Sequence, residues 1–548
     1  MKRNKWILLL CIFLFFSRTS FADDNLFSMP LDELMKIQIT SASKVSQALH
    51  QIPASVTVMT RSDISNYGYS TFNEILRNMA GIYIEEDTEE TYIGTRGAIG
   101  GGVLFLLNGI PHHPSLQKTL TTVEANRMNI PVASIDRIEF IRGPMSVIYG
   151  NNAFQGVLNI ITNLAKNNGV FSSLSSDGSG EVFLQGSHRD EVGFLTLNLG
   201  ASKQGSYSGD YRDMMSASQL AAMPQEAPAS MEGHMTRQLR SLDVSGQWYG
   251  LTSTLQYKKS TNGVYAATPP VDETYVVLEN WQGSLQYLAA MTERWQSRST
   301  LIYSEEEYNI HDFNIRHPAV TGSQEQSSRR HEFEQNFIYQ SDAEQSILLG
   351  YRYIKIDKMR NRLNLVDGDD NYLANRDDGM EKAYEHDLFA QWQQELSNKL
   401  GLVAGFRYSR TPGNYLVTLE QPKENISSVS VLQHSELKNN DRSAWNSRVA
   451  LLYQWDDRNQ FKLLHGTASQ DSASTSFSAP KAIRTSELAH TFDTHSWLLN
   501  QGVYVSHINK VVRRTVVYDD DAGKFVSSEL NNGHWKSFGY ELNVEYRP

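Results

Sequence analysis

The stretch SFGYELNVEYR, residues 537–547, alternates large apolar side chains with small or polar ones. Phe538 and Tyr540 fall on one face of an extended strand and Glu541 falls on the other, because successive side chains of a strand point in opposite directions. The same period of two recurs elsewhere, in WNSRVALLYQW (445–455), GLVAGFRYSR (401–410) and WQGSLQYLAA (281–290). Most of the chain beyond residue 163 is therefore predicted to form strands with one apolar and one polar face.

The links between these strands decide what kind of sheet they build, because the alternation alone fits a soluble sandwich or propeller equally well. Short links such as Tyr249–Gly250 alternate with long polar ones, which run roughly over 204–235, 307–328, 357–380 and 411–441. Short turns at one end and long loops at the other are typical of an outer-membrane barrel. Trp445 and Trp455, near strand ends, suit its two aromatic girdles. The sequence thus predicts a transmembrane antiparallel β-barrel.

The N-terminus has the pattern of a secretory signal peptide. Residues 1–22 contain a basic start, an apolar run from Trp6 to Phe16, and small residues before the expected cleavage after Ala22. The only cysteine, Cys11, lies in this signal, so the mature chain is predicted to contain no disulfide and no thiolate metal site. The net charge is −11, and the signal carries only basic charges, which makes nucleic acid an unsuitable partner.

Between the signal and the strands lies a segment that reads as a compact α+β domain. SVTVMT, VLFLLNG and DRIEFIRG are predicted to be short strands. Thr71 and Glu74 have the spacing of a capping box, and Gly81 is expected to close the helix that they begin. Asn108 and Gly109 suit a tight turn.

The motifs of this domain carry a resemblance. LHQIPASVTVMT (49–60), TFNEILRNMAGIYI (71–84), YIGTRG (92–97), VLFLLNGIP (103–111) and IEFIRGPMSVIYGNNAFQGVLNIIT (138–162) resemble, in order, the plug domain of TonB-dependent outer-membrane receptors. SFSAPKAIRTSEL (476–488) and GHWKSFGYELNVEY (533–546) resemble the barrel of the same family more diffusely. The resemblance implies a mainly β fold, with an α+β plug inside a barrel in the outer membrane of a Gram-negative bacterium.

Several residues gain an expected role from this resemblance. Arg96, Glu139 and Arg142 are expected to face the lumen and form ion pairs with the barrel wall, and glycines allow close approach of the plug backbone where a Cβ would clash. Those glycines are Gly143, Gly150 and Gly156. KIQITSAS, residues 36–43, stands where the family keeps its TonB box, an extended segment that adds as a strand to the periplasmic TonB energy-coupling complex. The box residues are Ile37, Gln38, Ile39, Thr40 and Ser41.

The resemblance also implies binding of a scarce chelate from outside, most simply a ferric siderophore. Exposed plug segments near Glu85, Gly100, His112 and His113 are the candidate ligand contacts. A cobalamin or haem receptor is the alternative, although FSAP (477–480) has serine where haem receptors have arginine. A passive surface barrel or adhesin is the other alternative. We identify no catalytic residue, resident metal or cofactor, since GSYSG (205–209) lacks the serine of a nucleophile elbow.

The predicted domain boundaries are 1–22 for the signal peptide, 23–51 for an N-terminal segment, 52–165 for the plug and 166–548 for the barrel. About sixteen strands are expected, whereas members of the family have about 22 and enclose a plugged lumen. A plug of this size fits only the larger barrel. We therefore expect an incomplete barrel whose first strand, near 171–177, is not paired with strand 536–547.

Overall fold

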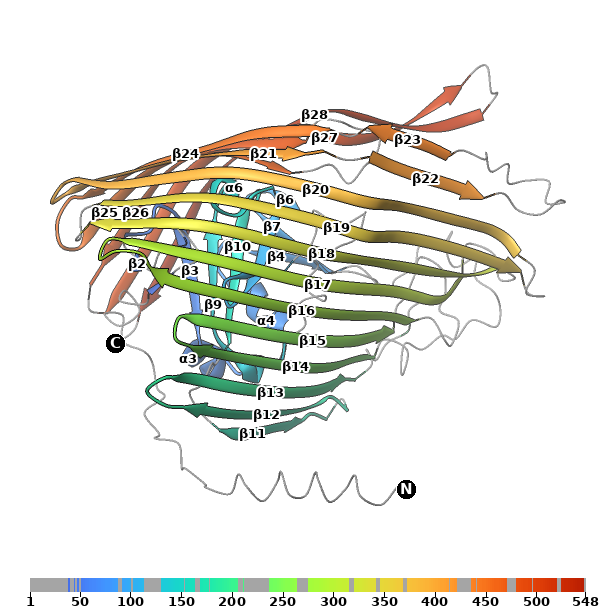
Figure 1. Cartoon of the computed structure of the whole chain (residues 1–548), viewed down its shortest axis with the longest axis horizontal. Coiled ribbons are helices and arrows are strands. Elements are labelled where there is room, and N and C mark those ends of the chain that lie inside the picture. Colours follow the sequence, from blue (N-terminus) through green and yellow to red (C-terminus); the bar gives the residue numbers. More distant parts are fainter. Residues whose placement is uncertain are drawn as a thin grey trace.

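The structure is a computed structural model of the whole chain. It describes residues 38–39, 44, 47–48, 51–86, 91–99, 102–112, 130–151, 153–162, 168–176, 178–205, 210, 236–263, 275–314, 320–341, 345–367, 372–412, 414–420, 435–439, 441–470, 480–494, 496–519 and 524–546. Two parts are evident: a long antiparallel sheet, and a smaller α+β domain that the sheet curves around (Figure 1). No helix within these described ranges is long and apolar enough to cross a membrane.

The long sheet contains 18 strands in sequence order, from β11 to β28. Two of them, β22 and β23, form a hairpin beside the outer part of β20, so β21 pairs directly with β24 and sixteen strands make the wall. The strands are β11 Gly169–Leu174, β12 Gly180–Arg189, β13 Gly193–Gln204, β14 Arg237–Trp248, β15 Leu251–Gly263, β16 Tyr275–Ala290, β17 Trp295–Asn314, β18 Val320–Ser341, β19 Gln345–Asp367, β20 Tyr372–Ser397, β21 Leu400–Thr411, β22 Asn414–Glu420, β23 Ser435–Asn439, β24 Arg442–Gln454, β25 Asn459–Gln470, β26 Lys481–Asp493, β27 Trp497–Asp519 and β28 Lys524–Tyr546.

The wall shows the period-two pattern on which the prediction rested. On β28, Phe538 and Tyr540 are exposed on the outer face, while Glu541 and Asn543 point inward. Aromatic pairs stand near both ends of the strands, as the predicted girdles require. Such pairs are Trp295 with Tyr339, Trp497 with Tyr546, Tyr257 with Trp281 and Tyr408 with Trp445. The outward face is thus suited to lipid along its whole circumference.

Two of the predicted long loops are mostly strand. The sequence predicted loops at 307–328 and 357–380, but β17 and β18 extend to Asn314 and Val320, and β19 and β20 to Asp367 and Tyr372. The difference has a physical reason: beyond the lipid, the outer face of a strand need not be apolar, so paired strands continue there without the alternating pattern.

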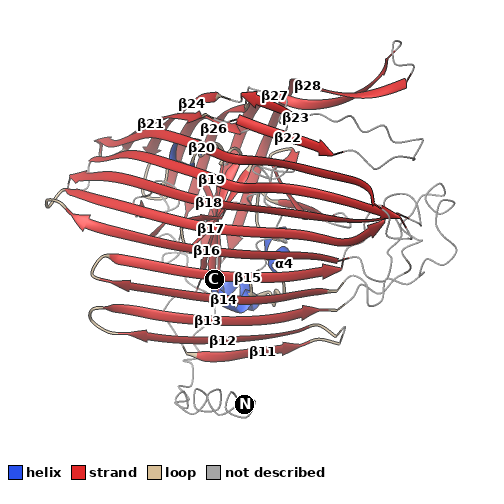
Figure 2. Ribbon diagram, turned by 45° about the vertical axis from the view of Figure 1, so that its right-hand side comes forward, coloured by secondary structure: helices blue, strands red, loops and turns tan. Residues whose placement is uncertain are grey.

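The two edges of the sheet are not joined. The strand order begins at β11 and ends at β28, and among the described residues no pairing connects these two strands. Figure 2 shows the sheet as a curved wall with β11 at one edge and β28 far from it. The expected separation of the first strand from the last is confirmed.

The enclosed domain is built on a five-stranded sheet of order β3-β9-β10-β7-β8, in which only β10 and β7 run parallel. A three-stranded sheet, β4-β5-β6, and a short hairpin, β1-β2, accompany it. The elements are β1 Gln38–Ile39, β2 Gln47–Ala48, β3 Ser55–Thr60, α3 Arg61–Asn66, α4 Phe72–Arg77, β4 Tyr83–Glu86, β5 Thr91–Thr95, β6 Ala98–Ile99, β7 Val103–Leu107, β8 Ile110–His112, the 3-10 helix Val132–Ser134, β9 Ile135–Arg142, α6 Ser146–Tyr149 and β10 Gly156–Thr162.

Every side chain of β7 is buried, because the two faces of its sheet are both covered. Phe105 and Leu107 pack in a cluster with α4, while Leu104 and Leu106 belong to a cluster that includes Phe389 of the wall. The domain therefore shares part of its apolar core with the barrel.

Helix α4 begins as the sequence predicts and ends differently. Thr71 accepts a hydrogen bond from the Glu74 backbone, and the Glu74 carboxylate accepts one from the Thr71 backbone, which completes the capping box. The helix ends at Arg77 with Asn78 as its C-cap, so the expected closure by Gly81 is wrong. Gly81 instead has a φ of +87° and leaves room for Arg142, whose Cδ would lie 2.9 Å from an added Cβ.

Candidate functional site: the contact between plug and wall

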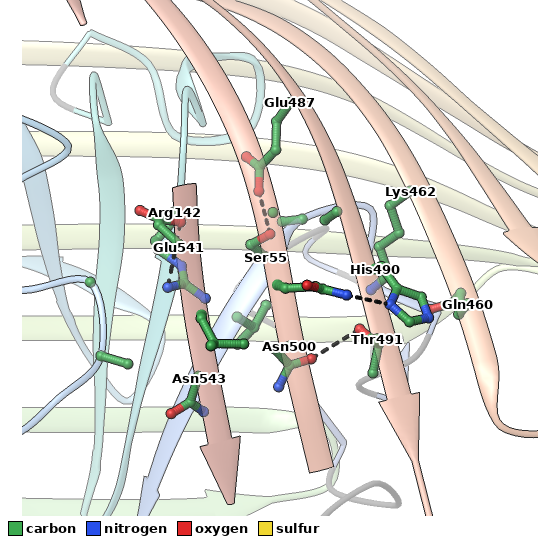
Figure 3. Close-up of a pocket in the computed structure, with 18 of the residues that line it drawn as sticks. Ser55, Arg142, Gln460, Lys462, Glu487, His490, Thr491, Asn500, Glu541 and Asn543 are labelled. Carbon is green, nitrogen blue, oxygen red and sulfur yellow. Dashed lines mark hydrogen bonds and ion pairs between the residues drawn. The ribbon is translucent and has the colours of Figure 1, made fainter. Parts of the chain in front are cut away.

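Two arginines of the enclosed domain meet two glutamates of the wall. Arg96 lies in the turn between β5 and β6, with its Nη1 2.8 Å from Glu487 on β26 and its Nη2 3.0 Å from Glu541 on β28. Arg142, at the end of β9, places its Nη1 3.6 Å from Glu541 (Figure 3). We call these four residues the charge cluster. It joins two segments of the plug to two strands of the wall through side chains that are mostly buried.

Burial and charge act in opposite directions on these arginines. Burial alone would lower the pKa of Arg96, but Glu487 and Glu541 outweigh burial and raise it above its ordinary value. For Arg142, burial wins over the attraction of Glu541, and the pKa is lowered. Removing one partner of a buried ion pair typically costs about 3–5 kcal/mol, because the remaining charge is left without compensation. The cluster is thus stable only as a whole.

A second contact joins wall cations to the backbone of α6. Arg352 on β19 donates from Nη1 to the Tyr149 carbonyl at 2.7 Å, and Arg407 on β21 donates to the Ile148 carbonyl at 3.3 Å. Asp387 on β20 accepts from both arginines and balances part of their charge. We call Arg352, Arg407 and Asp387 the helix clamp. Since the last carbonyls of a helix lack intrahelical partners, the clamp stabilises the C-terminal end of α6.

Gly150 explains why the helix clamp can reach the backbone. Its φ is +83°, and a Cβ there would lie 2.1 Å from Arg352 Nη2. The two other glycines expected at the wall have other neighbours. Gly143, with a φ of +92°, faces Arg96 of the plug, and a Cβ on Gly156 would lie 2.6 Å from the Ile141 carbonyl. The close approach at Gly156 is therefore between β9 and β10 of the plug, not between plug and wall.

A third contact holds the chain just before β3. Lys462 on β25 donates to the Ile52 carbonyl at 2.9 Å, and Arg448 on β24 donates to the Pro53 carbonyl. Ser55, the first residue of β3, donates to Glu487 at 2.5 Å. The wall thus binds the entry into the plug sheet mainly through backbone carbonyls.

The N-terminal segment also touches the wall. Gln38 and Ile39 of the predicted TonB box form β1, which pairs with Gln47–Ala48; Ile37, Thr40 and Ser41 lie outside the described residues. Lys44 forms an ion pair with Glu334 on β18 at 2.5 Å, and its carbonyl accepts from Arg298 at 2.8 Å. Burial lowers the pKa of Lys44 to about 8, against the opposing effect of Glu334.

The remaining predicted residues are placed as follows. Glu139 is fully buried and accepts hydrogen bonds from Arg137 and Asn159, both in the plug, a partner set that differs from the expected ion pair with the wall. Glu85 is exposed on β4. His112 is 2% exposed, and its Nδ1 lies 3.1 Å from Gln282 of the wall, which contradicts the expected exposed position. Gly100 and His113 lie outside the described residues.

A cavity of about 220 Å³ adjoins the charge cluster (Figure 3). On the plug side it is bounded by residues 54–56, by Ala80 and Gly81, and by Arg142. On the wall side β25 to β28 line it, mainly with amides and other polar groups; these include Gln460, Lys462, Glu487, His490, Thr491, Asn500, Gln501, Glu541 and Asn543. We call this space the seam cavity. Here plug and wall are separated by open space rather than by direct contact.

The wall residues of these contacts escaped the sequence analysis. Glu541 and Glu487 occupy inward positions of strands whose outward positions are apolar, so the phase of the alternation was a usable signal for them. The helix clamp had no such signal, because its partners are backbone carbonyls.

Comparison with known proteins agrees with this architecture. Residues 48–157 match the family model of the TonB-dependent receptor plug domain, and residues 230–546 match that of the TonB-dependent receptor-like β-barrel. An iron-regulated outer membrane virulence protein of Vibrio cholerae serotype O1 is 31% identical over 153 residues, a match that covers 27% of this chain and 22% of that relative. The aligned part is thus about a fifth of that relative's length.

Solved structures share the fold at low sequence identity. The ferric yersiniabactin uptake receptor FyuA from Yersinia pestis superimposes with a TM-score of 0.69 at 13% identity, over 90% of this chain and 76% of that one. The unliganded ferric citrate transporter FecA gives a TM-score of 0.68 at 14% identity, over 91% and 75% of the two chains. Because the barrel model alone matches more than half of the chain, the protein belongs to the TonB-dependent receptors of the outer membrane, a family of transport receptors in which a plug lies inside a β-barrel.

Proposed function

We propose that this receptor takes up a scarce iron chelate, most simply a ferric siderophore, and that TonB drives the uptake. The names of its relatives support the ligand class, since two of the solved structures carry ferric chelates in their titles and the Vibrio cholerae relative is iron-regulated. Glu85 and the neighbouring plug apex are the proposed ligand contacts from outside. TonB would add to residues 37–41 as a strand, using backbone hydrogen bonds for affinity.

One observation carries this proposal: besides the apolar clusters that they share, plug and wall are joined by several polar and ionic contacts. The charge cluster, the helix clamp and the bonds to residues 52–55 are all of this kind. A lost hydrogen bond between protein groups is replaced by bonds to water, so its net contribution is only about 1.5–3 kcal/mol even when one group is charged. A plug held in this way resists diffusion at rest and still yields to a directed pull.

The force exerted by TonB would be applied to the chain close to these contacts. Residues 37–41 lie a few residues before Lys44, which the wall binds through Glu334 and Arg298. The chain then reaches Ile52 and Pro53, bound by Lys462 and Arg448. Force applied at the TonB box is therefore transmitted to successive wall contacts in sequence order.

Growth on single iron sources tests the proposal. A host without its own receptors, with or without this gene, is given ferric citrate, a ferric catecholate, a ferric hydroxamate or haem, and cobalamin in a separate assay. We expect gene-dependent growth on a ferric chelate. Growth only on haem or cobalamin would select that alternative, and no growth on any source with normal surface expression would refute active uptake.

Deletion of residues 36–43 separates an energised receptor from a passive barrel or adhesin. We expect the deletion to abolish uptake and to leave chelate binding at the cell surface unchanged. A receptor that still supports uptake after the deletion would not need this segment for coupling to TonB.

A further inference from the structure

The seam cavity lies beside the strand that is easiest to remove from the plug. β3 is an edge strand, paired only with β9 within its sheet, and residues 54–56 form part of the cavity wall. β3 is also the first strand of that sheet after the N-terminal segment. At rest the cavity of about 220 Å³ is smaller than most small-ligand sites, which measure about 300–1,000 Å³. Withdrawal of β3 would enlarge it from the plug side.

The register of β3 links its withdrawal to the charge cluster. Ser55 pairs with Arg142, Val56 with Ile141 and so on to Thr60 with Arg137. A pull from the N-terminus therefore separates the Ser55 and Arg142 pair first. The same step removes the hydrogen bond from Ser55 to Glu487. Two residues of the charge cluster, Arg142 and Glu487, therefore each lose a contact with Ser55.

The rest of the plug is held on another part of the wall. β9 and β10 lie inside the plug sheet, each with two neighbours, and the helix clamp fixes α6 from β19, β20 and β21. The hydrogen bonds of the helix clamp do not involve β3, although Val56 and Val58 share an apolar cluster with α6. These bonds would continue to hold α6 after β3 is withdrawn.

The wall side of the cavity offers neutral hydrogen-bonding groups. Asn500 accepts a hydrogen bond from Thr491 at 2.9 Å, which holds its amide in a fixed orientation. An amide in such a bond keeps further donor or acceptor capacity, so Asn500 can still donate from its nitrogen. Neutral donors bind an oxygen-rich chelate weakly, and weak binding suits a passage that the substrate has to leave again.

We propose that the seam cavity is the exit site of the transported chelate: β3 withdraws, and Thr491, Asn500 and Asn543 of the wall contact the chelate as it passes towards the periplasm. This inference rests on the proposed function. It assigns the passage to the side of the plug that faces β25 to β28, and it leaves the side that faces β19 to β21 closed.

A pair of disulfide staples tests the withdrawal of β3. Ile141 lies between Val56 on β3 and Val157 on β10, so Val56→Cys/Ile141→Cys fixes β3 to β9, and Ile141→Cys/Val157→Cys fixes β9 to β10. Directly paired residues of antiparallel strands lie about 4.5–5.5 Å apart at Cα, within the range of a disulfide. The only native cysteine, Cys11, lies in the predicted signal peptide, so no other thiol of the mature chain is expected to compete.

Uptake of ferric citrate, a ferric catecholate and a ferric hydroxamate, each labelled with radioactive iron, is measured for both variants before and after reduction. We expect loss of uptake for the oxidised β3–β9 staple, recovery on reduction, and normal uptake for the β9–β10 staple in both states. The inference would be overturned if the oxidised β3–β9 variant took up iron as fast as the same variant after reduction. Loss of uptake by both oxidised variants would also overturn it. Absence of uptake by the reduced variants and the unmodified receptor alike would instead refute the proposed function.

A second experiment tests the side of the passage. Asn500→Cys places a thiol in the seam cavity, and the control Gln286→Cys places one on β16, also close to a short-turn end of the wall. Modification with a bulky maleimide should abolish uptake for Asn500→Cys and leave it unchanged for Gln286→Cys. Equal effects at the two positions, or an effect at Gln286→Cys alone, would overturn the assignment of the exit to β25–β28.

Discussion

The substitution Gly150→Ala tests whether the helix clamp sets the local stability of the plug around α6. Gly150 follows α6 with a φ of +83°, and its missing Cβ is the space that Arg352 Nη2 occupies, 2.1 Å from the ideal Cβ position. Alanine would therefore change two things at once: the backbone would be strained, and the guanidinium would have to move away from the Tyr149 carbonyl, to which it donates at 2.7 Å.

The structure separates these two effects. A non-glycine residue at such a positive φ costs roughly 1–3 kcal/mol, and Gly150, whose ψ is −160°, lies in a region that essentially only glycine adopts. Loss of a hydrogen bond from a charged group costs about 1.5–3 kcal/mol in addition. Gly109 provides the control, because its φ is +79° and nothing lies within 4 Å of its ideal Cβ position. We expect Gly109→Ala to cost only the strain, and Gly150→Ala to cost about 1.5–3 kcal/mol more.

Native-state hydrogen exchange measures this difference locally. Met145 N donates to Ala153 O at 2.9 Å, and residue 150 N donates to Ser146 O at 2.8 Å, so both amides report local opening of the plug around α6. A difference of about 1.4 kcal/mol changes an opening equilibrium tenfold, so their exchange should accelerate about ten- to a hundredfold more in Gly150→Ala than in Gly109→Ala. Equal acceleration would show that the contact with Arg352 does not limit opening.

Two further predictions concern the charges at the plug boundary. Lys44 has a pKa of about 8 in the folded state against 10.5 for the free side chain. The free energy with which its segment binds the wall should therefore become more favourable by roughly 3 kcal/mol as the pH rises from 8 to 10.5, and it should stay constant below pH 8. Limited proteolysis of that segment should slow as the pH rises across this range. Lys44→Met should remove this pH dependence, and slower proteolysis at lower pH would contradict the prediction. Glu541→Gln should weaken plug seating by about 3–5 kcal/mol and raise sensitivity to large antibiotics, since Arg96 and Arg142 lose a shared carboxylate. Glu279→Gln, which breaks an exposed outer pair with Lys259, should change seating by less than about 1 kcal/mol, and equal sensitivity of the two variants would argue against a role for the cluster.

The sequence was most informative where a local pattern has a direct structural cause. Alternation over residues 537–547 predicted which face of β28 is apolar, since lipid selects one side of every wall strand. The spacing of Thr71 and Glu74 predicted the start of α4, because a capping box is made within four consecutive residues. Arg96 and Arg142 form ion pairs with the wall as expected, although no local pattern identifies their partners.

Contacts between segments that are distant in the chain could not be predicted from the sequence. Arg96 and Glu541 are separated by 445 positions, and only the curvature of the wall around the plug brings them together. Gly156 was expected to face the wall, but the same small residue is needed wherever two backbones approach, and here the second backbone is β9. The strands that continue past the lipid at 307–328 lacked the apolar face by which strands were identified.

The wall cations that grip the plug have a consequence for exchange of parts between receptors. Arg352, Arg407, Arg448 and Lys462 all donate to main-chain oxygens of the plug. Every amino acid supplies such an oxygen, so these four donors impose a path on the plug chain but hardly restrict which side chains it carries. These four hydrogen bonds therefore do not depend on the side chains at residues 52–53 and 148–149, whereas the burial of Ile52, Ile148 and Tyr149 restricts those side chains separately. A foreign plug whose backbone follows this path would meet the same four donors.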